Sequence, residues 1–175
     1  MAVEYFSLEH DQRLEAIGSS ITFPEQVVQG FEHAEDSRTV FVKPERKQGY
    51  SCIIEHPVFL VSDEIQRIFS GFAPNMKSKT VHVINPNISS QDTYYLLDIP
   101  EIDCISSTHA TIEKGFVKKL VIREEPVENQ PIFKIKSLIR PSLVVRLDVA
   151  EALLRTSLYG LKIQRILTEA GVEHE

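Results

Sequence analysis

The sequence predicts an α+β fold: a mixed β-sheet with two similar strand–helix–strand units, at about residues 58–84 and 142–166, joined by β-rich segments. Two kinds of pattern support this fold. Short runs rich in β-branched residues alternate apolar and polar side chains, as half-buried strands do. Two other segments space their apolar residues three and four apart, which places them on one side of a helix. No apolar run approaches the roughly 18 residues that a membrane-spanning helix needs.

The first fifty-five residues predict short strands separated by loops. Tyr5–Leu8 and Thr39–Val42 are rich in aromatic and apolar residues, as strands are, and Gln12–Ile17 is consistent with one helical turn. The polar stretch Lys43–Tyr50 contains a proline and a glycine, which favour a loop. Cys52–Glu55 predicts another short strand.

A helix is predicted to begin at Ser62, after the apolar run Pro57–Val61. The side-chain oxygen of Ser62 or Asp63 can accept a hydrogen bond from a free amide of the first turn. Gly71 and Pro74 are expected to end the helix. Its apolar stripe consists of Ile65, Ile68, Phe69 and Phe72.

Strand-like patterns follow this helix. They occur at Thr80–Ile84, Thr93–Ile99, Lys118–Arg123, Ile132–Lys136 and Ser142–Val145. In the fourth segment Phe133 and Ile135 alternate with Lys134 and Lys136, which predicts that the lysines lie on one solvated face of the sheet.

A second helix is predicted over Asp148–Leu158, with Val149, Ala152 and Leu153 on one stripe. Gly160 is well placed to end it, because glycine accepts the left-handed conformation common just after a helix. Leu161–Ile166 alternates apolar and polar residues and predicts a final strand.

The two strand–helix–strand units match position by position. At an offset of 84 residues, Val61, Glu64, Ile65 and Phe69 correspond to Val145, Asp148, Val149 and Leu153. At an offset of 80, Val81 and Val83 correspond to Leu161 and Ile163. The correspondence between the two units concerns the fold and not the chemistry.

We expect one domain over residues 1–175, in which a β-rich part, residues 1–50, packs on a core part, residues 51–170.

The net formal charge of −6 is unevenly distributed. Residues 1–50 carry nine acidic and five basic side chains, whereas residues 101–175 carry eleven of each. The balance argues against a nucleic-acid-binding protein, because such proteins are usually basic over the binding face. The acidic first third is either a solvated surface or a face for a basic partner. Its candidate partner-binding residues are Glu32, Glu35 and Asp36.

Local motifs for catalysis, cofactors and metals are missing from the sequence. The scattered glycines form no phosphate-binding loop, and the six histidines have no metal-ligand spacing. Cys52 and Cys104 lie in apolar contexts and are expected to be buried and reduced. We therefore expect no cofactor and no metal.

Two alternatives to a binding protein remain open at this point. The first is an enzyme of unrecognised type with a site converging around His109 and Cys104, where Ser106–Thr108 add hydroxyl groups. We interpret that cluster as a polar strand edge or a turn. The second is a structural or oligomerisation module whose sheet edge pairs with another chain. The basic residues of the second half are interpreted as a solvated sheet face: Lys114, Lys118, Lys119, Arg123, Lys134, Lys136, Arg140 and Arg146.

Six short segments resemble a family of bacterial immunity proteins from polymorphic toxin systems, the eleventh in the usual naming. They are Phe59–Ile65, Tyr94–Asp98, Ile102–Ile105, Ile132–Ile135, Leu143–Val145 and Tyr159–Ile163, within residues 57–166. The chain departs from the family pattern at Arg146-Leu147, where the second helix commonly opens with Ser-Asp, and it has no tryptophan.

The resemblance implies a cytoplasmic α+β protein that binds and neutralises a cognate toxin domain, without catalysis and without a cofactor. The expected partner is thus a protein toxin, with no nucleic acid and no membrane involved. The first residues lack the basic and apolar regions of a secretory signal, which agrees with a cytoplasmic location. The oligomeric state stays open.

Overall fold

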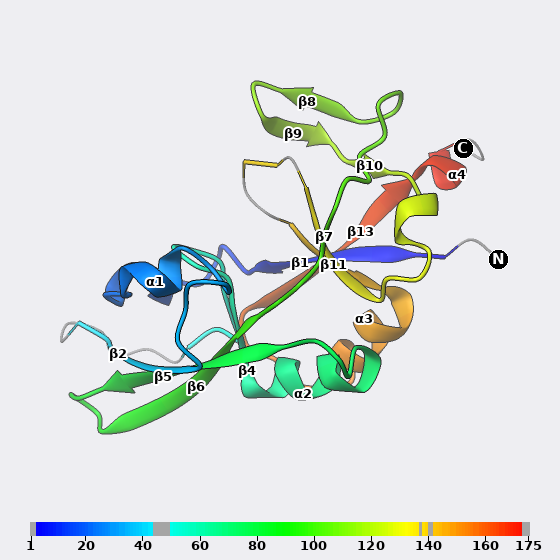
Figure 1. The fold of residues 1–175 in the computed structure, drawn as a ribbon. Helices are drawn as coiled ribbons and strands as arrows, with labels where there is room; N and C mark the ends of the chain where they lie inside the picture. The colour runs from blue at the N-terminus through cyan, green and yellow to red at the C-terminus, as the bar shows by residue number, and fades with distance from the viewer. Residues whose placement is uncertain (1–2, 44–49, 137, 140–141, 173–175) are drawn as a thin grey trace. The chain divides into compact units, whose positions relative to one another are not determined.

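Two large β-sheets, one in each of two units, organise the chain (Figure 1). The computed structural model describes residues 3–43, 50–136, 138–139 and 142–172. Unit 1 consists of residues 1–9, 99–156 and 162–175, and unit 2 consists of residues 10–98 and 157–161. Helices and strands occur in both, which confirms the α+β class. The expectation of one domain, with residues 1–50 packed on residues 51–170, stays a prediction.

The sheet of unit 2 has five strands in the order β2-β5-β6-β4-β3. They are β2 (Ser37–Phe41), β5 (Ser78–Asn85), β6 (Ser90–Leu97), β4 (Leu60–Ser62) and β3 (Ile53–Ile54). β2 pairs in parallel with β5, and the other neighbours are antiparallel. Helix α2 (Asp63–Phe72) connects β4 to β5 and packs against β4 and β6. Two short helical segments, η1 (Ile17–Ser20) and α1 (Glu25–Val28), precede β2.

The sheet of unit 1 has six strands in the order β10-β13-β1-β12-β11-β7. They are β10 (Val121–Ile122), β13 (Leu161–Thr168), β1 (Tyr5–His10), β12 (Leu143–Arg146), β11 (Ile132–Ile135) and β7 (Glu101–Ile102). Helix α3 (Leu147–Leu154) connects β12 to β13, and the short segments η2 (Glu125–Val127) and α4 (Glu169–Val172) complete the helices. β8 (Thr111–Glu113) and β9 (Phe116–Lys119) form a separate two-stranded sheet.

In each unit the long helix connects two strands that lie on either side of a third strand. β4 and β5 both run antiparallel to β6, so they are parallel to each other with β6 between them. β12 and β13 flank β1 in the same way. β12 is antiparallel to β1. The ion pairs Glu9–Lys162 (3.8 Å) and Glu4–Arg165 (2.5 Å) indicate that β13 is antiparallel to β1 as well. The two predicted strand–helix–strand units are confirmed.

Corresponding positions of the two units are buried alike through the first strand and the helix. At most 1% of the surface is exposed at Val61 and Val145, Ile65 and Val149, and Phe69 and Leu153. Glu64 and Asp148 are both exposed. The match weakens in the second strand, where Val81 and Val83 are buried but Leu161 and Ile163 are only partly buried.

Each unit has its own apolar core. In unit 1 the ring of Tyr5 meets Phe133 edge to face, with 5.8 Å between the ring centroids. The Tyr5 hydroxyl donates to the carbonyl of Val127 (3.1 Å), which pairs the polar end of a fully buried side chain. In unit 2 the residues of the sheet that pack with η1 and α1 include Val40, Leu60, Val81, Val83, Tyr94 and Leu96.

Three predicted boundaries are wrong. The helix predicted over Asp148–Leu158 ends at Leu154, because residues 157–161 belong to unit 2, where Tyr159 O accepts a hydrogen bond from Cys52 N–H (2.8 Å). Lys118–Arg123 is not one strand, since β9 ends at Lys119 and β10 belongs to the other sheet. The helical turn predicted at Gln12–Ile17 lies instead at η1.

The predicted start of α2 is correct, but its cap differs from the expectation. Ser62 occupies the N-cap position with an extended backbone, yet its hydroxyl makes no capping hydrogen bond. Asp63 pairs with Arg67 one turn later. Gly160 does not end α3; it lies in the turn before β13 with φ +79°.

We expect Leu153→Ala to destabilise the protein by about 2–5 kcal/mol, because Leu153 is 1% exposed and its loss leaves a cavity in the core. Leu154→Ala is the matched control: the neighbouring side chain is 70% exposed, so the same change should alter stability by less than about 0.5 kcal/mol. Urea unfolding followed by circular dichroism measures both, and equal losses would contradict the assignment of the buried face of α3.

Candidate functional site

A hollow of about 470 Å³ lies in unit 2, at the junction of β4 and α2. Its walls come from four segments: residues 50–52, residues 62–64 at the start of α2, residues 91–95 of β6, and residues 157–159. All four belong to unit 2. The volume is within the range of about 300–1,000 Å³ that is usual for small-ligand sites.

Ser51 holds the walls of the hollow together. Its carbonyl accepts a hydrogen bond from the hydroxyl of Tyr94 (2.6 Å), and its Oγ lies 3.0 Å from Nδ1 of His10. Ser51 Oγ also donates to Gly160 O (3.3 Å). A side chain at residue 160 would place Cβ 2.4 Å from Ser51 Oγ, so this close approach requires glycine. The segment that contains residues 157–159 is therefore fixed against residues 50–52.

Three carboxylates line the hollow, and they are not equivalent. Asp63 forms an ion pair with Arg67 and accepts a hydrogen bond from the Tyr95 hydroxyl (3.2 Å). Glu64 and Asp92 have no ion-pair partner within the described part of the chain. Burial, together with the charge of Glu64, raises the pKa of Asp92 above its ordinary value. The hollow thus holds negative charge that the described residues do not neutralise.

Tyrosines form much of the remaining wall. Tyr50, Tyr94, Tyr95 and Tyr159 line the hollow, and they are four of the five tyrosines of the chain. Burial raises the pKa of Tyr94 and of Tyr95, so both phenols stay protonated at neutral pH. Aromatic faces beside carboxylates are an environment that attracts cations.

Two hydroxyl groups in the walls are buried and unpaired. Among the described residues, Tyr50 Oη and Ser62 Oγ have no hydrogen-bond partner. An unpaired buried hydroxyl costs about 1–3 kcal/mol relative to a paired one. A polar group that entered the hollow and reached either hydroxyl would relieve this cost.

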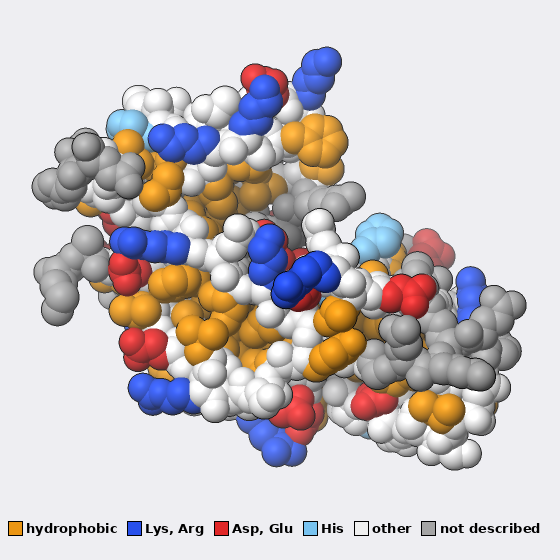
Figure 2. Space-filling view, turned by 180° about the vertical axis from the view of Figure 1, so that it is seen from behind, with side chains coloured by type: hydrophobic (Ala, Val, Ile, Leu, Met, Phe, Trp, Pro, Cys, Tyr) orange, Lys and Arg blue, Asp and Glu red, His pale blue; other side chains and the backbone are white. Residues whose placement is uncertain are grey.

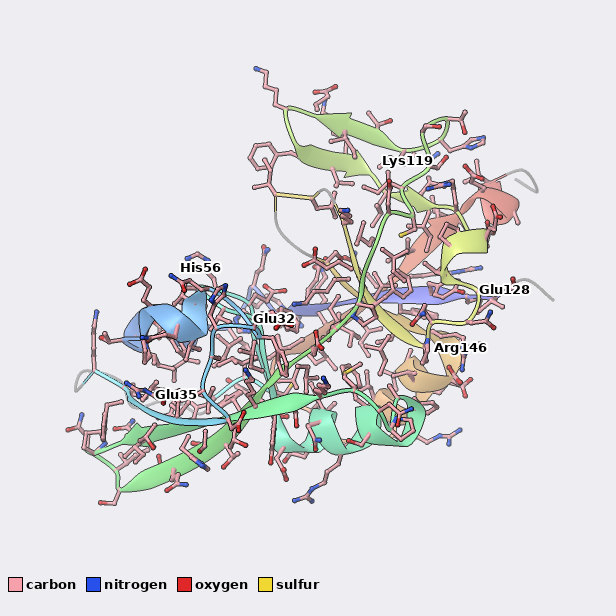
Figure 3. All side chains as sticks on the ribbon, in the orientation of Figure 1. Glu32, Glu35, His56, Lys119, Glu128 and Arg146 are labelled. Carbon is pink, nitrogen blue, oxygen red and sulfur yellow. The ribbon has the colours of Figure 1, made fainter. Side chains whose placement is uncertain are left out.

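The sequence-predicted partner-binding residues lie elsewhere in unit 2. Glu32, Glu35 and Asp36 are exposed on the segment between α1 and β2, where Figure 3 labels the first two. Glu35 pairs with Arg38 (2.9 Å). None of the three lines the hollow. The structure therefore places them together on one exposed segment, and whether a partner contacts them stays a prediction.

Lys79 fixes the segment that carries these acids. Its ammonium group donates to the carbonyls of Phe31 and Ala34, both at 2.6 Å, and lies 4.5 Å from the centroid of the Phe31 ring. The backbone N–H of Thr80 donates to Asp36 O (2.9 Å). The acidic side chains are thus presented on an anchored loop.

The two main residues of the enzyme alternative, Cys104 and His109, have different surroundings. Cys104 is fully buried, and burial raises the pKa of its thiol to about 11. His109 is partly buried, and its Nδ1 lies 3.0 Å from Thr108 Oγ1 and 3.5 Å from Ser106 Oγ within one turn. No hydrogen bond joins His109 to Cys104 among the residues described. The interpretation of Ser106–His109 as a turn is correct, and within it the hydroxyls of Ser106 and Thr108 approach the imidazole.

The predicted face of basic residues is not one surface. Lys114, Lys118 and Lys119 lie on the hairpin of β8 and β9, whereas Lys134 and Arg146 belong to the six-stranded sheet. Arg140 lies outside the described residues. Arg146 forms two hydrogen bonds with Asp148 (2.9 and 2.7 Å). The alternation of Phe133 and Ile135, which are buried, with the more exposed Lys134 and Lys136 is confirmed.

The hairpin of β8 and β9 also exposes apolar side chains, which the sequence interpretation missed. Every residue of both strands is exposed, including Ile112, Phe116 and Val117. Figure 2 shows apolar and basic side chains side by side over this hairpin, at the top of the view. The signal in the sequence was the dipeptide Lys114-Gly115, because glycine favours a tight hairpin turn; both residues adopt positive φ (50° and 80°) in the two-residue turn between β8 and β9.

Sequence reasoning did not identify the hollow. A usable signal existed, because three of the segments on which the family resemblance rests contribute to its walls: Phe59–Ile65, Tyr94–Asp98 and Tyr159–Ile163. Within the described ranges, no group of three or more His, Cys, Asp and Glu side chains is placed to hold a metal ion. No helix of those ranges is long and apolar enough to cross a membrane.

Comparison with known proteins identified one family. The model of the immunity protein family Imm11 matches residues 7–168, which include nearly all of both sheets and all four segments of the hollow. A search of curated proteins found no match.

We expect both cysteines to resist thiol reagents in the native protein at pH 8. Cys52 and Cys104 are free and buried, and burial raises their pKa to about 12 and about 11, so the reactive thiolate is populated only at higher pH. Reaction with 5,5′-dithiobis(2-nitrobenzoate) should detect both thiols only after unfolding in guanidinium. A Ser37→Cys variant, whose side chain starts from an exposed position, is the positive control. Rapid labelling of Cys104 in the native protein would revive the enzyme alternative.

Proposed function

We propose that this chain, which belongs to the Imm11 immunity protein family, neutralises a cognate toxin domain by binding it directly. The observation that carries the proposal is the family match over residues 7–168, since it spans the folded parts of both units. Immunity by binding requires a preformed complementary surface and no chemical step. The proposed place of action is the cytoplasm of the bacterial cell that makes the toxin.

We propose no catalytic role for the chain. Cys104 is fully buried with a raised pKa, and His109 is engaged within its own turn. A cysteine nucleophile needs a thiolate that is accessible to the substrate and populated at neutral pH. Cys104 meets neither requirement, because its side chain is buried and the pKa of its thiol is raised. The arrangement supports a binding protein rather than an enzyme built on these two residues.

The excess of acidic side chains in unit 2 supports this unit as the part of the chain that binds the toxin. Unit 2 carries twelve acidic and eight basic side chains, whereas unit 1 carries thirteen and eleven. Glu32, Glu35 and Asp36 add an exposed acidic segment to unit 2. Such charges mainly raise the association rate and select the partner, because long-range attraction orients the two proteins before contact. We propose that these three residues face a basic surface of the toxin.

Neutralisation is tested with the toxin domain encoded beside this chain's gene. We expect expression of that domain alone to stop growth and co-expression of this chain to restore it, with the two proteins copurifying as one complex. A toxin domain from an unrelated system is the specificity control and should not be neutralised. Growth arrest despite soluble, folded chain, with no complex on size-exclusion chromatography, would contradict the proposal.

The acidic segment is tested by the variant Glu32→Lys, Glu35→Lys, Asp36→Lys. We expect the association rate with the toxin domain to fall by about tenfold or more at low salt, and the difference to shrink in 0.5 M salt, because salt screens exposed charges. The matched control reverses three exposed acids of unit 1, Glu113, Glu128 and Glu151, and changes the net charge equally. Unchanged binding of the first variant at low salt, measured by surface plasmon resonance, would mean that the toxin binds another surface.

A further inference from the structure

We infer that the hollow of unit 2 is a receptor for one basic side chain of the protein partner, an arginine by preference. This inference rests on the proposed function for the identity of the partner. Its chemistry rests on the hollow itself: two carboxylates without a cation, four tyrosines and two unpaired hydroxyls around one cavity.

The charges of the hollow are the first argument. Asp63 is neutralised by Arg67, so the free negative charge comes from Glu64 and Asp92. The positive end of α2 favours Glu64, which is in its first turn. Asp92 lies on β6 rather than in the helix, and is partly buried. Burial and the nearby charge of Glu64 both raise its pKa. A cation placed between the two carboxylates would offset the unfavourable burial of Asp92 and the repulsion from Glu64.

The aromatic walls favour a guanidinium over a small ion. A planar guanidinium stacks on tyrosine rings and presents five N–H donors to carboxylates and hydroxyls, whereas a simple metal ion does neither. Tyr50 Oη and Ser62 Oγ are buried oxygens without partners among the described residues, and a hydroxyl oxygen can accept such donors once a side-chain rotation turns it towards them. The volume of about 470 Å³ is large enough for a whole side chain.

The walls are also held in place before any ligand arrives. Hydrogen bonds from Tyr94 to Ser51 O (2.6 Å) and from Cys52 N to Tyr159 O (2.8 Å) connect three of the four wall segments. A preformed site loses little conformational entropy on binding, so a single side chain inserted there contributes more affinity than one held on a mobile surface.

A small-molecule probe tests the chemistry without the toxin. We expect N-acetyl-arginine amide to change the tyrosine fluorescence of the protein in a saturable way. The neutral isostere N-acetyl-citrulline amide should bind about tenfold more weakly or not at all. The chain has no tryptophan, and four of its five tyrosines line the hollow, so the signal comes mainly from this site. Equal binding of the two probes, or no saturable binding of either, would overturn the inference.

The variant Glu64→Gln, Asp92→Asn tests the same site from the protein side. It should lose binding of the arginine probe and bind the toxin domain at least about tenfold more weakly, because one desolvated charge of the partner loses its counter-charges. The matched control is Glu25→Gln, Asp98→Asn, which removes two exposed carboxylates of unit 2 outside the hollow and should leave both affinities unchanged. Thermal unfolding checks that both variants are folded.

The outcomes separate this inference from the proposed function. If the unaltered chain binds the toxin domain and the Glu64→Gln, Asp92→Asn variant binds it equally well, the inference is overturned and the proposed function stands. If the unaltered chain binds the arginine probe but not the toxin domain, the proposed function is overturned and the cation preference of the hollow stands. Competition of millimolar N-acetyl-arginine amide with the toxin domain for the unaltered chain supports both.

Discussion

The structure depends on one constraint. Each long helix connects two parallel strands, and a third strand must be inserted between them. In unit 2 the inserted strand is β6, which reaches its place through a short hairpin from β5. In unit 1 it is β1, so Tyr5 must pair with Arg146 from the far end of the chain. Closing so long a loop costs only slightly more entropy than closing a moderate one, because the cost grows with the logarithm of length. The complete burial of Tyr5 and Leu8 offsets it.

The junction between the first strand and the helix has the same geometry in both units but a different electrostatic outcome. At corresponding positions, Glu64 lacks an ion-pair partner among the described residues, whereas Asp148 is held by two hydrogen bonds from Arg146. These bonds lower the pKa of Asp148. Arg146 occupies the position that corresponds to Ser62 of the first unit at the offset of 84 residues. This difference neutralises one junction, while the other borders a hollow with uncompensated negative charge.

A protein that neutralises a toxin by binding needs affinity and specificity rather than chemistry, and the charges of unit 2 can supply them at two ranges. In the proposed complex, exposed acids such as Glu32 and Asp36 would act over distances of about a Debye length and mainly accelerate encounter. The partly buried Asp92 would act only at contact, where exclusion of water strengthens its attraction to a cation. The first kind of charge tolerates variation in the partner surface, and the second requires a particular side chain in a particular place.

The sequence by itself determined the local elements. The period of the apolar residues identified both long helices and most strands, because burial of one face dictates which positions are apolar. It also identified Cys52 and Cys104 as buried thiols, and the repeated strand–helix–strand pattern with matched buried positions from Val61 and Val145 onward. The family resemblance arose from the same short segments and is confirmed by the match over residues 7–168.

Only the tertiary structure decided where α3 ends and where the hollow lies. The helix predicted to reach Leu158 ends at Leu154, and beyond it the backbone N–H groups of Cys52 and Asp11 donate to the carbonyls of Tyr159 and Gly160. The hollow depends on where α3 ends, because residues 157–159, which follow the helix, form one of its walls. The other three wall segments are distant from them in sequence. Periodicity reports which face of an element is buried, but not which elements meet, and a site built between elements is therefore invisible to it.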